Sequence, residues 1–296
     1  CVNNDFFDEE VSYDYFSTTY KFLYFDTLIE LNNIHHELVA VHNEKMVSHT
    51  AMVLFQFKVK NKIVKAGFGS NLIIDKTQRK GPLFFILQSK YLNSYNKKGI
   101  YFTYGLVTRA QVLSLHLRTG YRKAGVVPVY ARPYNSISLS KYYIASTFFK
   151  TLLSPFLKLA NIVLSKNWLG KSDVKIHEIT SFNESINEIV SQFLDRIQFS
   201  ALRNDKILNW RFSKFYHRNY KIFITIENEK ITGYAITRKM KMKEFISLAL
   251  VDILFLPEDK KTAKALLGAV HLQALEELGA EVELDNGMII TKGKLR

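Results

Sequence analysis

The sequence predicts an α+β fold in which mixed, mostly antiparallel sheets are flanked by helices, arranged as two domains. Runs rich in β-branched and aromatic residues follow one another with short turn-like connections, which is typical of antiparallel strands. Amphipathic helical stretches separate the later strands, so the sheet is expected to be mixed. The length of 296 residues corresponds to about two domains at roughly 150 residues each.

Composition excludes several classes of protein. Hydrophobic residues make up 47% of the chain and charged residues 23%, as in ordinary soluble proteins, which excludes a disordered or fibrous chain. The 41 Lys and Arg residues against 27 Asp and Glu residues give a net charge of +14, which favours polyanionic partners such as phosphate-rich cofactors, nucleic acid or acidic lipid. The single cysteine, Cys1, excludes an internal disulfide and a cysteine-based zinc site.

The first residues of the chain and its apolar stretches indicate the cellular compartment in which the protein is expected. The chain begins with Cys1 rather than Met and lacks the pattern of a signal peptide, which is consistent with a fragment of a longer protein. No apolar stretch reaches the roughly 20 uninterrupted residues that a membrane-spanning helix needs. We therefore expect a cytoplasmic protein.

The first domain is expected over residues 1–133, and its chain order gives a mixed sheet. Turn-like HNEK and KNK separate the first three strands, which predicts an antiparallel meander. Pro82 suits the first turn of a helix, and Gly120 is a natural helix stop. The expected elements are strands at 38–41, 53–59 and 66–74, a helix at 83–98, a strand at 99–104, a helix at 109–118 and a strand pair at 121–133.

A helical linker over residues 134–172 separates the two domains. Its apolar and basic part, residues 144–164, is expected to pack as a connecting helix; the alternative is peripheral contact with an anionic membrane surface. The second domain is expected over residues 173–296. Its predicted elements are strands at 174–180, 220–226, 230–238, 245–256 and 280–284, and helices at 183–197, 204–212 and 260–278.

The two domains repeat one order of elements. In the first, a strand ending LIID leads through a loop into a helix that ends NKKG before the strand IYFTY. In the second, a strand ending LFLP leads through EDKK into a helix that ends EELG before the strand AEVEL. This shared order predicts a tandem repeat of one structural unit.

The loop between the third strand and the first long helix of the first domain predicts an anion site. Its six residues combine a helix N-terminus, whose backbone N–H groups have no helical acceptor, with a glycine and two basic side chains. The alternative is an ordinary basic turn before a helix. The residues are Gln78, Arg79, Lys80, Gly81, Pro82 and Leu83.

This loop resembles the signature of the GNAT superfamily of acyl-CoA N-acyltransferases, Gln/Arg-x-x-Gly-x-Gly/Ala between the fourth strand and the third helix. Gln78 and Gly81 match it, and Leu83 stands where a small residue is usual. The next strand and a helix closing with Gly120 and Tyr121 follow in the family's order. The resemblance covers about residues 37–133 and, more loosely, 174–285.

The resemblance implies acetyl-CoA as co-substrate and a primary amine of a small molecule as acceptor. The pantetheine would pair with the backbone near Ile73 and Ile74, as an added strand would, and the pyrophosphate would lie on the loop from Gln78 to Leu83. Arg109, before the next helix, is a further expected cofactor contact. The acceptor class is an amino sugar or amino-acid derivative.

The resemblance also indicates catalytic groups. The family's acid is often a Tyr four residues before the terminal Gly of this helix, a position occupied here by His116, which could serve or could be a structural histidine. The family's carboxylate on the fourth strand has no counterpart, since 66–74 carries only Ser70 and Asn71 as polar groups. Glu44 or Tyr104, acting through water, are the candidates for the base, and the reaction without any base is the alternative.

The second domain lacks the phosphate loop. The corresponding PEDKKT at 257–262 has no glycine and carries two acidic residues, so only the first domain is expected to bind CoA. RNDKILNWRF at 203–212 resembles a segment of tandem GNAT-like proteins of bacterial cell-envelope and polysaccharide biosynthesis. The alternative for that segment is a packed helix in which Leu208 and Trp210 face the core.

Other functions are less favoured. The eight histidines show no ligand spacing, so no metal site is expected, and no nucleophilic Ser lies in a Gly-x-Ser-x-Gly setting. Basic, aromatic-rich stretches occur without a nucleic-acid motif, so no dedicated nucleic-acid binding is expected. We predict a tandem GNAT-like N-acetyltransferase, catalytic in its first domain. The alternatives are a non-catalytic scaffold and an aminoacyl-tRNA-dependent transferase of the same fold.

Overall fold

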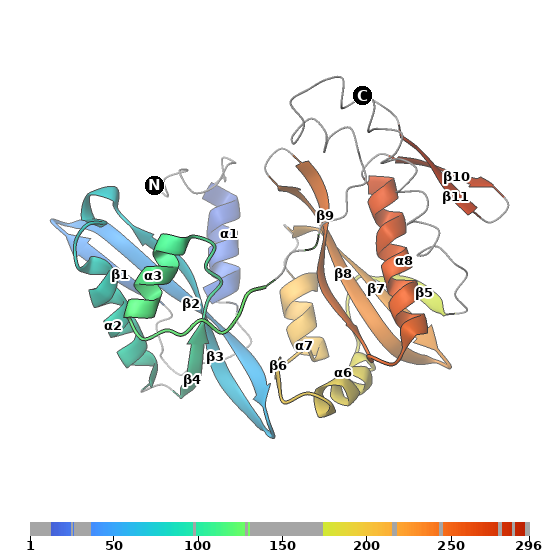
Figure 1. The fold of residues 1–296 in the computed structure, drawn as a ribbon, viewed down its shortest axis with the longest axis horizontal. Helices are drawn as coiled ribbons and strands as arrows, with labels where there is room; N and C mark the ends of the chain where they lie inside the picture. Colours follow the sequence, from blue (N-terminus) through green and yellow to red (C-terminus); the bar gives the residue numbers. More distant parts are fainter. Residues whose placement is uncertain are drawn as a thin grey trace. The chain divides into compact units, whose positions relative to one another are not determined.

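A computed structural model describes residues 13–24, 26, 37–96, 99–127, 130, 174–214, 218–242, 245–277, 280–285 and 288–293. The chain divides into two compact units. Unit 1 comprises Cys1–Pro128 together with Leu194–Leu202, and unit 2 comprises Val129–Phe193 and Arg203–Arg296. Each unit has its own sheet flanked by helices (Figure 1), one sheet mixed and the other antiparallel, which confirms the predicted α+β class. The linker predicted over 134–172 lies outside the described residues.

Unit 1 is built on a five-stranded sheet in which β1, β2, β3 and β4 lie in that order. The first three strands are antiparallel neighbours, as the meander predicted, and β3 pairs parallel with β4. Its elements are α1 (Tyr13–Tyr24), β1 (Glu37–His42), β2 (Lys45–Val59), β3 (Lys62–Ile74), η2 (Lys76–Gln78), α2 (Leu83–Asn96), β4 (Ile100–Tyr104), α3 (Ala110–Arg118) and β6 (Phe199–Ala201).

The turns of unit 1 follow from the residues that form them. Asn43 and Glu44, between β1 and β2, have φ angles of 48° and 61°, the left-handed geometry of a tight hairpin turn whose twist matches the strands. Gly120, which follows the C-cap Thr119 of α3, has a φ of +96°, a conformation that ends the helix at little cost only in glycine.

Helix α2 covers one face of this sheet. The core there comprises Met52, Leu54, Tyr91, Tyr95 and Ile100. Gly67 of β3 allows Met52 to lie flat on the sheet, because a Cβ at that position would stand 1.5 Å from the Met52 Sδ. Burial of this apolar surface stabilises the unit by roughly 25 cal/mol for each Å² removed from water.

Helix α1 covers the opposite face of the same sheet. Successive residues of a strand point to opposite faces. A Cβ on Gly69 would lie 3.7 Å from the Tyr91 hydroxyl of α2, whereas the next residue, Ser70, contacts the Tyr24 hydroxyl of α1. The two helices therefore sandwich the middle of β3.

Unit 2 is built on a four-stranded antiparallel sheet in the order β5, β7, β8, β9, with α8 packed against it (Figure 1). Its core includes Phe223, Ala235, Leu266 and Ala269. Its elements are β5 (Lys175–Ile179), α6 (Ile186–Asp195), α7 (Asp205–Leu208), η3 (Asn209–Ser213), β7 (Tyr220–Glu227), β8 (Lys230–Met242), β9 (Phe245–Phe255), α8 (Lys260–Glu277), β10 (Ala280–Asp285) and β11 (Met288–Gly293).

Several features differ from the sequence-based expectations, among them helix α1 and strand β11, neither of which was predicted. The strand pair predicted at 121–133 is wrong for its described residues, 121–127 and 130, which belong to no strand. The short strand β6, not predicted, pairs with the end of β2 at Phe57–Val59. Strand β10 pairs with β11 in a separate two-stranded sheet, whereas β4, its expected counterpart, pairs parallel with β3.

Candidate active site

Strands β3 and β4 diverge in the middle of unit 1 and leave a fork between them. Their parallel pairing ends at Phe68 and Tyr104, while β3 continues to Ile74. The six further residues extend β3 by about 20 Å at roughly 3.3 Å per residue. Over this length β3 has no partner strand on its β4 side among the described residues, so its edge can accept an extended ligand as an added strand would be accepted.

A bulge bends β3 just beyond the fork. The register against β2 shifts between the His49–Ile73 and Ala51–Ser70 pairs, and Asn71 has a φ of 51°. A bulge increases local twist and turns backbone groups away from the regular ladder. Here it lies within the stretch of β3 that borders the fork, between the Ser70 and Ile73 pairs with β2.

The predicted pantetheine contacts, Ile73 and Ile74, lie at the end of β3. The Ile73 carbonyl faces β2, where it accepts from the Ser48 hydroxyl at 2.8 Å, and the next amide on that side, Asp75 N–H, donates to the Val47 carbonyl. Backbone groups of successive residues face opposite strand edges, so those of Ile74 face the fork. Of these, the Ile74 carbonyl already accepts from Arg79 Nε at 3.0 Å, which leaves the Ile74 amide as the group directed at a ligand.

The predicted phosphate loop lies between this strand and α2, as expected, but its hydrogen bonds differ from the expectation. The Gly81 amide donates to the Gln78 carbonyl at 3.2 Å and closes a turn. The first α2 amide bonded in helical fashion is that of Ile86, which donates to the Pro82 carbonyl. The amides without a helical acceptor are therefore those of the first turn, which begins at Leu83. These amides point out of the N-terminal end of α2, where they can bind an anion.

The side chains of the loop leave this helix end accessible. Lys80, Gly81 and Pro82 are exposed, and Gln78 is half-buried. A Cβ at Gly81 would meet nothing nearer than the Gln78 carbonyl oxygen at 3.5 Å. Arg109, the other predicted cofactor contact, is an exposed residue at the N-terminal cap of α3.

His116 lies next to the loop. Its ring packs edge-on against Phe84, in the first turn of α2, and against Tyr121, with both centroid distances 5.2 Å. Burial lowers the pKa of His116, and its buried Nδ1 has no hydrogen-bond partner among the described residues. The ring is therefore mainly neutral at neutral pH, which makes it a weak proton donor.

Tyr121 is a functional candidate that the sequence reasoning did not assign. Its hydroxyl accepts a hydrogen bond from Thr103 Oγ1 of β4 at 3.2 Å. Thr103 pairs with Gly67 one residue before the fork opens. Burial raises the pKa of the Tyr121 hydroxyl, so it keeps its proton at neutral pH and can donate it.

The two residues predicted as candidates for the base lie apart. Tyr104 is at the end of β4, where its ring packs against Phe57 and Phe68 at centroid distances of 5.4 and 5.2 Å. Glu44 is exposed in the β1–β2 turn. Tyr104 thus borders the fork, whereas no described contact connects Glu44 with it.

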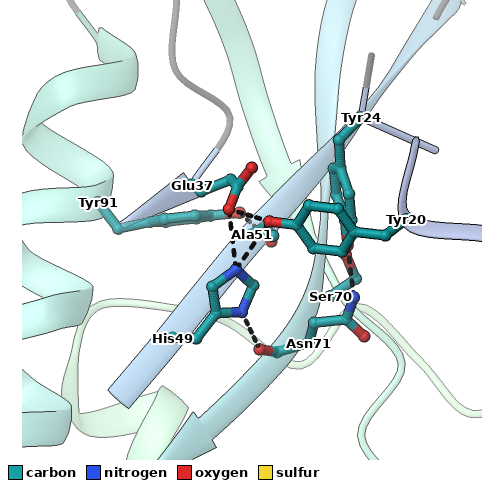
Figure 2. A network of polar contacts seen from close by, with 8 residues as sticks. All are labelled: Tyr20, Tyr24, Glu37, His49, Ala51, Ser70, Asn71 and Tyr91. Carbon is teal, nitrogen blue, oxygen red and sulfur yellow. Dashed lines mark hydrogen bonds and ion pairs between the residues drawn. The ribbon is translucent and has the colours of Figure 1, made fainter. Parts of the chain in front are cut away.

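A polar network joins α1, β1 and β2 to the bulge of β3 (Figure 2). Tyr20 donates to Glu37 Oε2, and its hydroxyl also lies 3.2 Å from His49 Nε2. His49 Nδ1 lies 3.0 Å from the Asn71 carbonyl oxygen, and His49 Nε2 lies 3.2 Å from Glu37 Oε2. The network was not predicted, because its members are distant in the sequence and meet only through strand pairing.

Tyr24 completes the network at the bulge. Its hydroxyl lies 2.6 Å from Ser70 Oγ and accepts from Asn71 Nδ2 at 2.8 Å (Figure 2). Ser70 and Asn71, the polar groups predicted on this strand, are thus both held by α1. On the other face, the Tyr91 hydroxyl of α2 donates to the Ala51 carbonyl at 3.3 Å.

Comparison with solved structures identifies the fold. The chain superposes on a GCN5-related N-acetyltransferase from Kribbella flavida with a TM-score of 0.52 and 13% identity, covering 81% of this chain and 50% of that one. A GCN5-related N-acetyltransferase from Anabaena variabilis gives a TM-score of 0.51 and 11% identity, with coverages of 81% and 53%. The chain has the GNAT fold. It spans about half the length of these two proteins.

No protein-family model matches the sequence, and no curated protein sequence matches it significantly. The GNAT fold is therefore carried by the structure, at an identity too low to transfer an activity. Among the residues that the structure describes, no three His, Cys, Asp or Glu side chains gather as a metal site would require. No helix in the described part of the chain is long and apolar enough to cross a membrane.

In unit 2, the loop before α8 is built differently from the loop before α2. Asp259 Oδ1 accepts the Thr262 amide at 2.9 Å and caps α8. A carboxylate at this helix end satisfies an amide that an anion would otherwise bind, and it repels a phosphate. That only the first unit binds CoA stays a prediction.

The segment RNDKILNWRF packs as a structural element of unit 2. Asn204 caps α7 by accepting the Ile207 amide, and Leu208 and Trp210 are buried. Asn209 binds both backbone groups of Phe182, accepting its N–H at 2.8 Å and donating to its carbonyl at 2.7 Å. The packed-helix alternative accounts for the segment, with the refinement that α7 continues as the π-helical turn η3.

Proposed function

We propose that unit 1 is an N-acyltransferase that moves an acetyl group from acetyl-CoA to a primary amine of a small molecule. The single observation that carries the proposal is the fork between β3 and β4, whose free strand edge leads directly to the N-terminus of α2. An extended pantetheine needs such an edge, and a diphosphate needs such a helix end. The two occur here in one continuous stretch of chain, from Asn71 to Leu83.

The donor is proposed to lie along this stretch. Its diphosphate would meet the first-turn amides of α2, with Lys80 and Arg109 supplying positive charge near them. Gly81 would contribute by having no side chain, since its amide is used within the turn. The pantetheine would follow the free edge of β3 past Ile74 toward the bulge. Several negative charges on CoA give the chain's net charge of +14 a role.

Two groups compete for protonation of the departing thiolate. His116 occupies the position indicated by the GNAT resemblance, and Tyr121 lies beside it. We favour Tyr121, because burial lowers the pKa of His116 and raises that of Tyr121, so only Tyr121 keeps a transferable proton in its majority form. Tyr104, whose ring packs against Phe68, would line the fork on the face of the sheet opposite to Tyr121.

The proposal also covers the class of the acceptor, the cellular compartment of the reaction and the role of unit 2. An amino sugar or an amino-acid derivative carries the primary amine that this reaction needs. Acetyl-CoA is a cytoplasmic metabolite, so we assign the reaction to the cytoplasm. Unit 2 is proposed to be a second GNAT-like copy without a donor site, an interpretation supported by its strand–helix order and by Asp259 at its α8 terminus.

A second candidate function is a non-catalytic scaffold built on the GNAT fold. It is favoured by the absence of a carboxylate from β3 and by Leu83 in place of a small residue. Isothermal titration with acetyl-CoA separates the two functions. Binding supports the transferase, and the absence of heat at millimolar ligand supports the scaffold.

A further inference from the structure

The closed end of the fork limits where the acyl group of a bound donor can extend. Strands β3 and β4 form their last pair at Phe68 and Tyr104. Beyond this pair, β4 itself occupies the position in the sheet that an added strand would take. The chain of a longer acyl group must therefore leave the plane of the sheet and turn toward one of its two faces.

The α2 face is filled at this point. Met52 and Tyr91, which belong to the core under α2, are almost completely buried. A Cβ on Gly69 would lie 3.7 Å from the Tyr91 hydroxyl, which donates to the Ala51 carbonyl. Close packing of this kind leaves no space for added methylene groups. The α2 face therefore offers a longer acyl chain no surface to lie on.

The α1 face carries aromatic rings instead. Phe68 stands two residues before Ser70, which contacts Tyr24 of α1, so both side chains point to this face. Tyr104 pairs with Phe68, and their ring centroids lie 5.2 Å apart. Five rings from four strands converge here, and we call them the aromatic floor: Phe57, Phe68, Phe102, Tyr104 and Phe199.

The aromatic floor forms a continuous path that begins at the fork. The ring centroid of Tyr104 lies 6.0 Å from that of Phe102, which lies 5.7 Å from that of Phe199 on β6. The buried ring of Phe57 contacts all three, with centroid distances between 5.2 and 5.4 Å. These are the spacings of aromatic rings in contact, so no gap interrupts the path.

The far end of the aromatic floor is open to a ligand. Phe199 is 58% exposed although it contacts two other rings, and Phe102 and Tyr104 are half-buried. Of the five side chains, only that of Tyr104 has a polar atom. A sugar or a carboxylate would lose hydrogen bonds to water that these rings do not replace, whereas a hydrocarbon loses none. The floor is therefore suited to a hydrocarbon chain.

We propose that the aromatic floor binds the hydrocarbon chain of the acyl donor, so that unit 1 takes medium-chain acyl-CoA thioesters in preference to acetyl-CoA; this inference rests on the proposed function. The thioester carbon lies at the fork, and the first methylene groups pass over Tyr104. The following ones cross Phe102 and reach Phe199. Phe199 is the specificity-determining residue, because its ring supplies the most exposed part of the path.

Titration calorimetry of the full chain with acetyl-CoA, butyryl-CoA and octanoyl-CoA tests this assignment without any acceptor. Each methylene group removed from water raises affinity about fourfold. We expect octanoyl-CoA to bind about 30-fold or more tighter than acetyl-CoA, which corresponds to burial of only part of its chain. Butyryl-CoA should lie between the two and close to acetyl-CoA.

Two matched variants locate the binding surface of the chain. Phe199→Ser should lower the affinity for octanoyl-CoA about 10-fold and leave that for acetyl-CoA unchanged, which also shows that the variant is folded. Ile63→Ser is the control. Ile63 is an apolar side chain of β3 that is 65% exposed and lies on the same face as Gly67 and Gly69, opposite to the aromatic floor. It should bind both thioesters as the wild type does.

The possible results separate this inference from the proposed function. Equal affinity of the wild type for acetyl-CoA and octanoyl-CoA would overturn the inference and leave the proposed function standing, as would an undiminished preference for octanoyl-CoA in Phe199→Ser. Octylamine is the probe for the acceptor. If it bound more weakly to Phe199→Ser than to the wild type, while the acyl chain length had no effect, the floor would serve the acceptor and the donor assignment would be wrong. Binding of none of the thioesters would overturn the proposed function itself.

Discussion

The imidazole ring of His116 packs against the ring of Phe84, with centroids 5.2 Å apart and planes at 76°. Phe84 is buried in the first turn of α2, so this contact ties α3 to the helix end proposed to bind the diphosphate. The contact also shields one side of the half-buried His116 ring from solvent. Several expected outcomes depend on this arrangement.

Acid should destabilise the protein partly through His116. Because burial lowers its folded-state pKa below the ordinary value, the unfolded chain binds a proton that the folded chain does not, and stability falls as the pH drops below about 6.5. Replacement His116→Phe keeps the ring contacts and removes the titration. Denaturant unfolding at several pH values should show that the free energy of unfolding falls less on acidification in the variant than in the wild type. An equal fall in the two proteins would contradict the role of His116.

Tyr121 and His116 can be separated kinetically. We expect Tyr121→Phe to lower turnover about 100-fold, since the variant lacks the hydroxyl proton, and His116→Gln to lower it much less. Neither variant should change acetyl-CoA affinity, because neither side chain touches the loop from Gln78 to Leu83 in hydrogen bonds. A larger loss of turnover in His116→Gln than in Tyr121→Phe would instead indicate that His116 donates the proton.

Two glycines of β3 offer a matched test of packing. Gly67→Ala should destabilise unit 1 by about 1–3 kcal/mol, the usual cost of overpacking, because its Cβ would overlap the buried Met52. Gly69→Ala should cost less, since its Cβ would meet only atoms at 3.7 Å. Thermal or denaturant unfolding measures both variants. Equal losses would show that Met52 moves aside freely.

Asn209 should stabilise unit 2 through the backbone of Phe182. Asn209→Ala removes two hydrogen bonds and leaves the Phe182 N–H and carbonyl without them, at a cost of about 1–3 kcal/mol. The exposed Asn93→Ala on α2 is the control and should change stability by no more than about 0.5 kcal/mol. A small effect at Asn209 would indicate that water replaces the lost bonds.

Local patterns predicted most of the elements. The hairpin between β1 and β2, the helix beginning at Leu83 and the stop at Gly120 each depend on residues adjacent in the sequence. Strand β6 could not be predicted this way, because three residues gain their strand character only by pairing with β2, far away in the chain. The strand pair predicted at 121–133 does not form over its described residues, where Val126 and Val127 are exposed rather than packed against a sheet.

The candidate site was predictable in part. The sequence order placed an anion-directed loop between a strand and a helix, and the structure has this arrangement. It could not indicate that Gly81 donates its amide within a turn, since that depends on the loop conformation. Nor could spacing bring Glu37 and His49 together, because their contact requires the register of β1 against β2.

The measurement that tests the account most directly is titration calorimetry of acetyl-CoA with the wild type, Gly81→Glu and Gly125→Glu. Space at both glycines admits a side chain without backbone overlap, and neither has a positive φ, so both variants should fold. We expect the wild type and Gly125→Glu to bind acetyl-CoA and Gly81→Glu not to bind it, because a carboxylate at that loop would block and repel the diphosphate. Unchanged affinity in Gly81→Glu, or no binding by the wild type at millimolar acetyl-CoA, would contradict the account.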